Sequence, residues 1–186
     1  RRILPDILQK LKLGPSDSLF DIGCGTGNLL IPLSFFVGSA TGIDHPRVIE
    51  RLKIRYTDTE VTLVGGNFLD EYINQSFSKI LIYSVLHNLS DQKEAYQFLD
   101  KAISLLSLGG MLLVGDIPNR DLKERFLSSD EGNAFLVSWN AELEASRKTP
   151  PDLPVDQDTV DFDDGLIARI LERYSGSKII CTLLDL

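Results

Sequence analysis

Residues 19–28 read LFDIGCGTGN, an apolar run that passes directly into a turn built on three alternating glycines. A short apolar run stopped by glycines predicts a buried strand. The glycines allow a sharp turn and let a ligand approach the backbone closely. We expect a helix to begin near Thr26, and its free N–H groups and partial positive charge suit an anion such as a ligand carboxylate. The stretch therefore predicts a strand, a ligand-binding turn and a helix.

Similar apolar runs recur along the chain. They are rich in branched residues and lack an in/out alternation, which is typical of strands covered on both faces. Segments of helical period lie between them, one starting at Asp91 and ending at Gly109 and Gly110, and another at 162–174. The further strands are predicted at 40–44, 60–64, 79–83, 111–115 and 178–184.

Strands that alternate with helices indicate parallel strands joined by right-handed crossovers. The predicted fold class is therefore α/β, a doubly wound, mostly parallel sheet flanked by helices. With 186 residues the chain fits one domain over 1–186. Residues 119–160 interrupt the alternation with mixed helical and proline-rich sequence, and they follow the fifth strand. We expect them to form a helical and loop cover over the substrate side.

Composition excludes several classes of function. The net charge of −8 repels phosphate backbones, so a nucleic-acid partner is not expected. No apolar run approaches the roughly 20 residues that span a bilayer, and the sequence predicts no membrane partner and a cytoplasmic location. Cys24 and Cys181 lack metal-ligand spacing, and the acidic residues between 152 and 164 fail the calcium-loop pattern. No metal is expected.

Asp21 separates this turn from a dinucleotide-binding turn, which would normally have an apolar residue there. Gly-x-Gly-x-x-Gly would also need a small residue at Asn28. The segment DIGCGTG, residues 21–27, instead resembles the signature of the Rossmann-like (class I) S-adenosylmethionine-dependent methyltransferases. The similarity covers residues 17–116 and includes four further segments in the family's order. The resemblance implies the same fold, S-adenosylmethionine as cofactor, and a cofactor site along the strand ends.

The resemblance also assigns roles residue by residue. Asp44, at the end of the second strand, would accept the ribose hydroxyls, and His45 would lie against the adenine edge. Asn67 stands where the family usually has an acid, and its amide oxygen could accept from the adenine amine. Phe68 would offer its backbone N–H to the ring. The remaining implied cofactor-binding residues are Asp21, Gly23, Cys24 and Gly25 in the turn, and Tyr83 and Ser84 beside the methyl group.

His87 follows the fourth strand and is the candidate catalytic residue. A histidine imidazole can remove a proton from a hydroxyl or amine, but His87 could equally be a packing histidine. Methyl transfer needs little beyond in-line placement, because the sulfonium leaving group is already activated. Holding the acceptor ~3–3.5 Å from the methyl carbon supplies much of the acceleration. We expect direct in-line displacement.

The acceptor is predicted by what the fourth strand lacks. It has neither an Asn-Pro-Pro-Tyr segment nor the carboxylates of metal-assisted catechol methylation, which favours an oxygen or nitrogen of a small molecule. Residues 115–127 resemble members from saccharide pathways. The alternatives are a non-catalytic cofactor-binding subunit and an NAD(P)-dependent oxidoreductase. The family usually has two strands after the last helix, and the single one here, 178–184, suggests truncation. The sequence does not indicate the oligomeric state.

Overall fold

The computed structural model describes residues 3–57, 60–146 and 160–183. Six parallel strands form one sheet in the order β3-β2-β1-β4-β5-β6. The chain therefore winds outward from β1 in one direction and returns through β4 in the other, as the alternation of elements predicted. The strands are β1 (Ser18–Ile22), β2 (Ser39–Asp44), β3 (Val61–Gly65), β4 (Phe77–Tyr83), β5 (Leu106–Ile117) and β6 (Lys178–Leu183).

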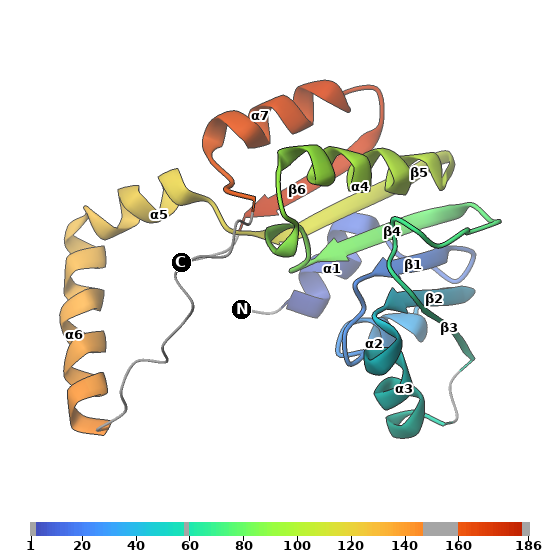
Figure 1. The fold of residues 1–186 in the computed structure, drawn as a ribbon, viewed down its shortest axis with the longest axis horizontal. Coiled ribbons are helices and arrows are strands. Elements are labelled where there is room, and N and C mark those ends of the chain that lie inside the picture. The colour runs from blue at the N-terminus through green and yellow to red at the C-terminus, as the bar shows by residue number, and fades with distance from the viewer. Residues whose placement is uncertain (1–2, 58–59, 147–159, 184–186) are drawn as a thin grey trace.

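Helices cover both faces of the sheet (Figure 1). On one face, α1 packs on Leu19, Leu81 and Leu113 of the central strands, and α2 and α3 cover β2 and β3. On the other face, α4 and α7 pack on alternate residues of the same strands, such as Phe20 and Ile80. The helices are α1 (Ile3–Leu11), α2 (Leu30–Ser34), α3 (Pro46–Arg55), the 3₁₀ turn η1 (Leu86–Asn88), α4 (Gln92–Ser104), α5 (Arg120–Leu127), α6 (Asp130–Ser146) and α7 (Asp164–Arg173).

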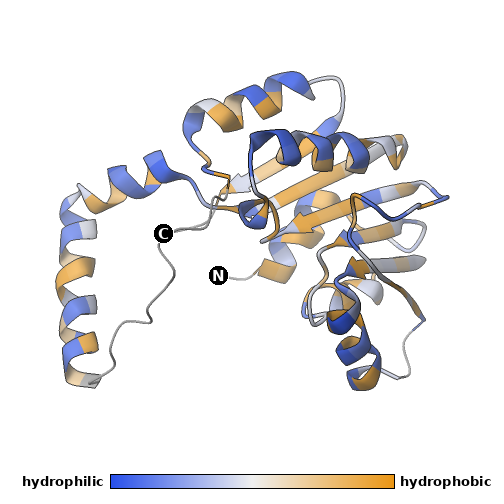
Figure 2. Cartoon of the chain, in the orientation of Figure 1, coloured by the Kyte–Doolittle hydropathy of each residue, from blue (hydrophilic) through white to orange (hydrophobic). Residues whose placement is uncertain are grey.

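Burial explains why the strands lack an alternating pattern. The strands consist mostly of hydrophobic residues, and the helices that pack on the sheet mix hydrophobic with hydrophilic residues (Figure 2). The buried residues of these helices, such as Phe98 of α4 and Ile170 of α7, belong to the core beside the strands. Two helices begin at aspartate caps: Asp91 accepts from the Glu94 N–H at 2.7 Å, and Asp163 accepts from the Leu166 N–H at 2.6 Å. In the described residues, every helix is too short or too polar to cross a lipid bilayer.

Two predicted helix boundaries were wrong. The helix expected near Thr26 begins at Leu30, because Gly25 and Gly27 adopt φ of 54° and 80°, which a right-handed helix cannot include. The helix from Asp91 ends at Ser104, well before the glycines expected to stop it. Those glycines instead lie inside β5, where its pairing with β4 changes register. Gly109 has a φ of 78°, so the pair forms an irregular strand entry.

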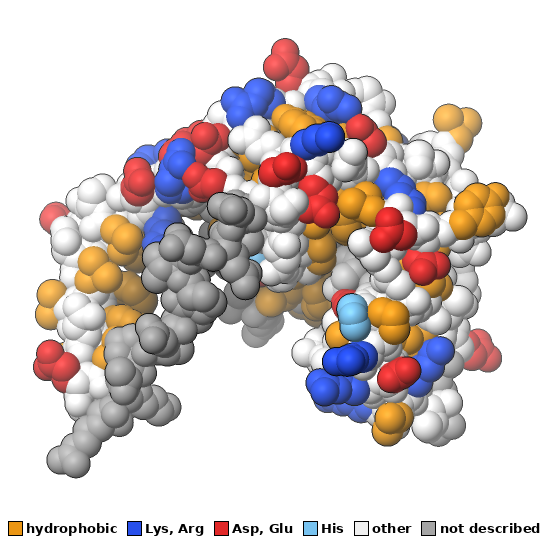
Figure 3. Space-filling model, in the orientation of Figure 1, with side chains coloured by type: hydrophobic (Ala, Val, Ile, Leu, Met, Phe, Trp, Pro, Cys, Tyr) orange, Lys and Arg blue, Asp and Glu red, His pale blue; other side chains and the backbone are white. Residues whose placement is uncertain are grey.

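The segment expected to cover the substrate side forms α5 and α6 in its described part, and residues 147–159 lie outside the described residues. Salt bridges from Arg120 to Asp161 and Asp163, and from Arg125 to Asp164, hold α5 against the start of α7. Helix α6 projects away from the sheet (Figure 1), and hydrophobic side chains lie on its surface (orange in Figure 3). Among its exposed residues are Phe135, Val137 and Trp139. Its role as a cover stays a prediction.

Candidate functional site

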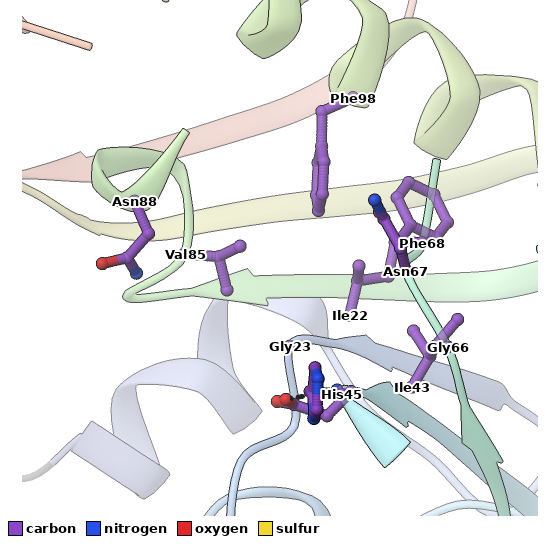
Figure 4. Close-up of a pocket in the computed structure, with 11 residues that line it drawn as sticks. Ile22, Gly23, Ile43, His45, Gly66, Asn67, Phe68, Val85, Asn88 and Phe98 are labelled. Atoms are coloured by element: carbon purple, nitrogen blue, oxygen red, sulfur yellow. Dashed lines mark hydrogen bonds between the residues drawn. The ribbon is translucent and has the colours of Figure 1, made fainter. Parts of the chain in front are cut away.

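A cavity of about 510 Å³ opens at the carboxyl ends of β1, β2 and β4. It lies where the strand order reverses, between β1 and β4, which is where open parallel sheets bind their ligands. Figure 4 shows the lining side chains converging from the strand ends and from α4. They are Ile22, Gly23, Ile43, Asp44, His45, Gly66, Asn67, Phe68, Val85, Asn88 and Phe98.

The glycine turn is held against the end of β2. The N–H groups of Gly23 and Cys24 both donate to the carbonyl oxygen of Ile43, at 2.8 and 3.2 Å. Gly23 has a φ of 79°, and a Cβ on it would lie 2.4 Å from Cγ2 of Val85. A Cβ on Gly25 would meet no atom within 4 Å. The turn therefore brings bare backbone to the cavity and leaves space beside Gly25.

Asp44 connects the end of β2 to the turn. Its Oδ2 accepts from the Gly25 N–H at 2.8 Å, and its Oδ1 accepts from the His45 N–H at 2.6 Å. The carboxylate lines the cavity. Because each carboxylate oxygen can accept more than one hydrogen bond, Asp44 can hold the turn and still accept from a ligand hydroxyl. This position fits the ribose role that the family resemblance implies.

Asp21 is buried beneath the turn and does not line the cavity; its side chain is 2% exposed. Its Oδ2 has no hydrogen-bond partner among the described residues. Burial, and then the nearby Asp44 carboxylate, raise the pKa of Asp21 to about 7. A carboxyl group in this environment is poised between its neutral and charged forms at physiological pH.

One side of the cavity is formed by the turn after β3. Oδ1 of Asn67 accepts from the Leu69 N–H at 3.0 Å, so the amide stabilises its own turn. The Phe68 side chain is 5% exposed and packs on Phe98 with 4.7 Å between ring centroids. Across the cavity, Nδ1 of His45 accepts from the Arg47 N–H at 3.3 Å and caps α3. Both polar side chains thus have local structural roles as well as lining the cavity.

Two predicted site residues direct their side chains into the core. Cys24 packs with Leu30 and Ile31, and burial, followed by Asp21 and Asp44, raises the pKa of its thiol. The Tyr83 ring packs against Gly115 on the α1 face of the sheet. Neither side chain lines the cavity, so any contact that these residues make with a cofactor comes from the backbone.

Ser84, just after β4, and Asp116, the last but one residue of the adjacent β5, have the same unusual conformation. Their φ values are 58° and 60°, in the left-handed region that non-glycine residues rarely adopt. Oγ of Ser84 donates to Oδ2 of Asp116. Strained residues of this kind concentrate at functional sites. In the strand order, Ser84 lies one strand and Asp116 two strands from β1, the strand that leads into the glycine turn.

His87 lies in η1, and its imidazole is not part of the cavity lining. Its Nδ1 is buried without a hydrogen-bond partner among the described residues. The structure therefore does not bring this candidate base to the cavity that Asp44 and Asn67 share. Its neighbours Val85 and Asn88 line the cavity instead, and the Asn88 amide donates to the Ser84 carbonyl at 3.3 Å.

Sequence reasoning missed the apolar walls of the cavity. The side chains of Ile22, Ile43 and Val85 end or follow strands, and Phe98 extends from the inner face of α4. Each reads as ordinary core in the sequence. Once the topology is known, residues near the ends of the strands beside the point where the strand order reverses can be assigned to the site.

Replacing Gly25 with alanine is expected to lower stability by about 1–2 kcal/mol, the cost of left-handed backbone for a residue with a Cβ. The added methyl group meets no neighbour, so the loss isolates the backbone requirement of the turn. Thermal melting measures it. Gly176→Ala is the matched control, since that glycine also has open space but no positive φ. Equal melting temperatures for the two variants would contradict the expectation.

A parallel sheet with a glycine turn after β1 and a carboxylate at the end of β2 defines a nucleoside-binding α/β domain. The comparisons identify it further. The methyltransferase domain family matches residues 20–114, about half of the chain, and the chain belongs to this family of Rossmann-like, S-adenosylmethionine-dependent methyltransferases. No curated protein matches the chain in sequence.

Solved structures agree with the fold. The N-methyltransferase NodS from Bradyrhizobium japonicum WM9, in complex with S-adenosyl-L-homocysteine, is 25% identical over 60% of this chain and 59% of its own, with a TM-score of 0.56. A second NodS structure covers 74% of this chain and 80% of its own at 22% identity and a TM-score of 0.59. Magnesium protoporphyrin IX methyltransferase from Synechocystis PCC 6803, with bound S-adenosylhomocysteine, covers 92% and 68% at 15% identity and a TM-score of 0.62. The chain thus spans about three fifths of the ligand-bound NodS structure.

Proposed function

We propose that this chain binds S-adenosylmethionine in the cavity at the ends of β1, β2 and β4, and transfers its methyl group to an oxygen or nitrogen of a small molecule. The observation that carries the proposal is the joint between Asp44 and the glycine turn. One carboxylate holds the Gly25 N–H and faces the cavity, so the sugar contact and the backbone cradle are organised by the same group.

The residues present fit the cofactor. The open space at Gly25 can admit its amino-acid portion, Asp44 can accept from the ribose, and the apolar walls of Ile43, Phe68 and Phe98 suit a planar base. When bound, S-adenosylmethionine would supply a methyl group activated by its sulfonium, with neutral S-adenosylhomocysteine as the leaving group and the acceptor's proton released to solvent. The chain itself binds, aligns and excludes water.

The acceptor is proposed to lie over the ends of β4 and β5, next to the Ser84–Asp116 pair. A serine hydroxyl and a carboxylate can orient an acceptor hydroxyl or amine without a metal ligand set. Direct in-line displacement requires only this alignment, which agrees with His87 lying outside the cavity lining. A saccharide-related acceptor and a cytoplasmic location remain proposals from the sequence, and the net charge of −8 disfavours nucleic acid.

Thermal-shift titration with S-adenosylhomocysteine and with NAD⁺ tests the assignment. We expect S-adenosylhomocysteine to raise the melting temperature in a concentration-dependent way. At 100 times its dissociation constant, the ligand should stabilise the folded chain by about 2.7 kcal/mol. NAD⁺ is the control ligand. Stabilisation by NAD⁺ alone would favour the oxidoreductase alternative. Cofactor binding without methyl transfer to any of a panel of hydroxyl and amine acceptors would favour a non-catalytic subunit.

A crystal structure with S-adenosylhomocysteine tests the placement. Its ribose is expected at Asp44 and its sulfur near the end of β4. A ligand seated elsewhere would overturn the proposed site even if binding were confirmed.

A further inference from the structure

The turn that follows β3 is closed by its own residues. The Asn67 carbonyl accepts from the N–H groups of Asp70 and Glu71, each at 3.0 Å, and the Asn67 side chain accepts from the Leu69 N–H. These bonds shape residues 67–71 locally. They do not by themselves determine where the turn sits relative to the sheet.

Lys101, on α4, ties this turn to the body of the domain. Its Nζ donates to the carbonyl oxygens of Leu69 at 3.0 Å and Glu71 at 2.6 Å. The same ammonium lies 5.1 Å from the centroid of the Phe68 ring. One half-buried cation therefore contacts three of the five residues of the turn from an element 30 residues away. Charge-assisted bonds of this kind are stronger than neutral ones.

Phe68 carries this restraint into the cavity. Its ring packs between Phe98, 4.7 Å away between centroids, and Phe20, 6.1 Å away. Both Phe68 and Asn67 line the cavity. A shift of the turn would therefore move the Asn67 amide and the Phe68 backbone N–H, which are the groups placed to read a base edge.

We propose that Lys101 is a positioning residue that sets the base specificity of the cavity, by fixing the turn 67–71 in the orientation that reads adenine. The inference rests on the proposed cofactor function and goes beyond it, because Lys101 does not line the cavity. Removing the ammonium leaves the Leu69 and Glu71 carbonyls to water, and the turn keeps the ring packing of Phe68 but loses its long-range hydrogen bonds to α4. The groups that discriminate the base then lose their alignment.

Isothermal titration of S-adenosylhomocysteine and S-inosylhomocysteine tests the proposal, since the two ligands differ only in the base. We expect Lys101→Met to weaken adenosylhomocysteine binding about tenfold and to reduce the preference over the inosyl compound by a similar factor. Lys101→Arg, which can still donate to both carbonyls, is expected to restore most of the preference. Lys93→Met is the matched control on the same helix, because Lys93 is exposed and, among the described residues, has no hydrogen bond to residues 67–71.

The ratio of the two dissociation constants decides the outcome. A merely structural role would weaken both ligands equally and leave the ratio unchanged, and that result would overturn the proposal. Thermal melting checks that each variant folds; should Lys101→Met unfold, Lys101→Gln is judged by the same ratio. A wild-type chain that binds neither ligand would overturn the proposed function itself, whereas wild-type binding with an unchanged ratio in the variants would overturn only the role of Lys101.

Discussion

Asp44→Ala is expected to weaken binding of S-adenosylhomocysteine by about 1–3 kcal/mol, or about 5–150-fold. Asp44 lines the cavity, and it is the residue that we propose accepts from the ribose hydroxyls. It also holds the Gly25 N–H at 2.8 Å, so alanine removes a ligand contact and loosens the turn at the same time.

Isothermal titration measures this loss. Glu50→Ala is the control, because Glu50 is an exposed acid on α3, the helix that follows β2. Asp44→Asn separates the loss of the charged ligand contact from the loosening of the turn, because the asparagine amide oxygen can still accept from the Gly25 N–H but carries no charge. An unchanged affinity in Asp44→Ala would place the ribose contact elsewhere.

Asp21→Asn is expected to stabilise the domain at neutral pH and to change how stability depends on pH. The pKa of Asp21 is raised to about 7 in the folded chain by burial and by Asp44, against an ordinary value of 3.8. A carboxyl group whose pKa is raised in the folded state keeps its proton up to a higher pH there than in the unfolded chain. Its contribution to stability is therefore complete below about pH 4 and is lost as the pH rises towards 7.

The measurement is the free energy of unfolding, from denaturant titrations at several pH values. Between about pH 4 and pH 7, the stability of the variant should gain on that of the wild type by up to ~1.4 kcal/mol per pH unit, and the difference should be flat outside that window. Asp70→Asn is the control, because Asp70 is exposed. A difference that does not vary with pH would show that Asp21 is charged throughout.

Much of the fold follows from the sequence because both strand and helix periods are strong. Apolar runs without alternation place the strands, and the order of elements requires a parallel sheet. The acid at the second strand end was also predictable, since Asp44 stands in register with the glycine turn. The family match over residues 20–114 confirms the identification that these segments suggested.

The boundaries and the cavity walls could not be predicted, for physical reasons. Whether Gly25 and Gly27 belong to the first turn of a helix or precede it depends on their φ angles. Glycine can adopt positive or negative φ, so the sequence does not decide this. Whether the side chains of Cys24 and Tyr83 point to the cavity or to the core depends on the backbone conformation at each residue, and both point to the core. The role of Lys101 could not be predicted, because its partners are backbone carbonyls 30 and 32 residues away. The pattern of side chains in the sequence does not indicate such contacts.

The pairing of β1 with β4 also has a kinetic consequence. Leu19 lies opposite Lys79, so the middle of the sheet closes only when segments 60 residues apart meet. Until then β1 carries an open edge bearing Leu19 and Phe20, both fully buried in the native state. The entropy of closing a loop of this length is lost before the contacts between β1 and β4 can stabilise the fold. Folding should therefore be slow relative to helical bundles of similar size. The strand order that places the cavity between β1 and β4 is therefore expected to delay the completion of the core and to leave apolar strand residues exposed to aggregation in the nascent chain.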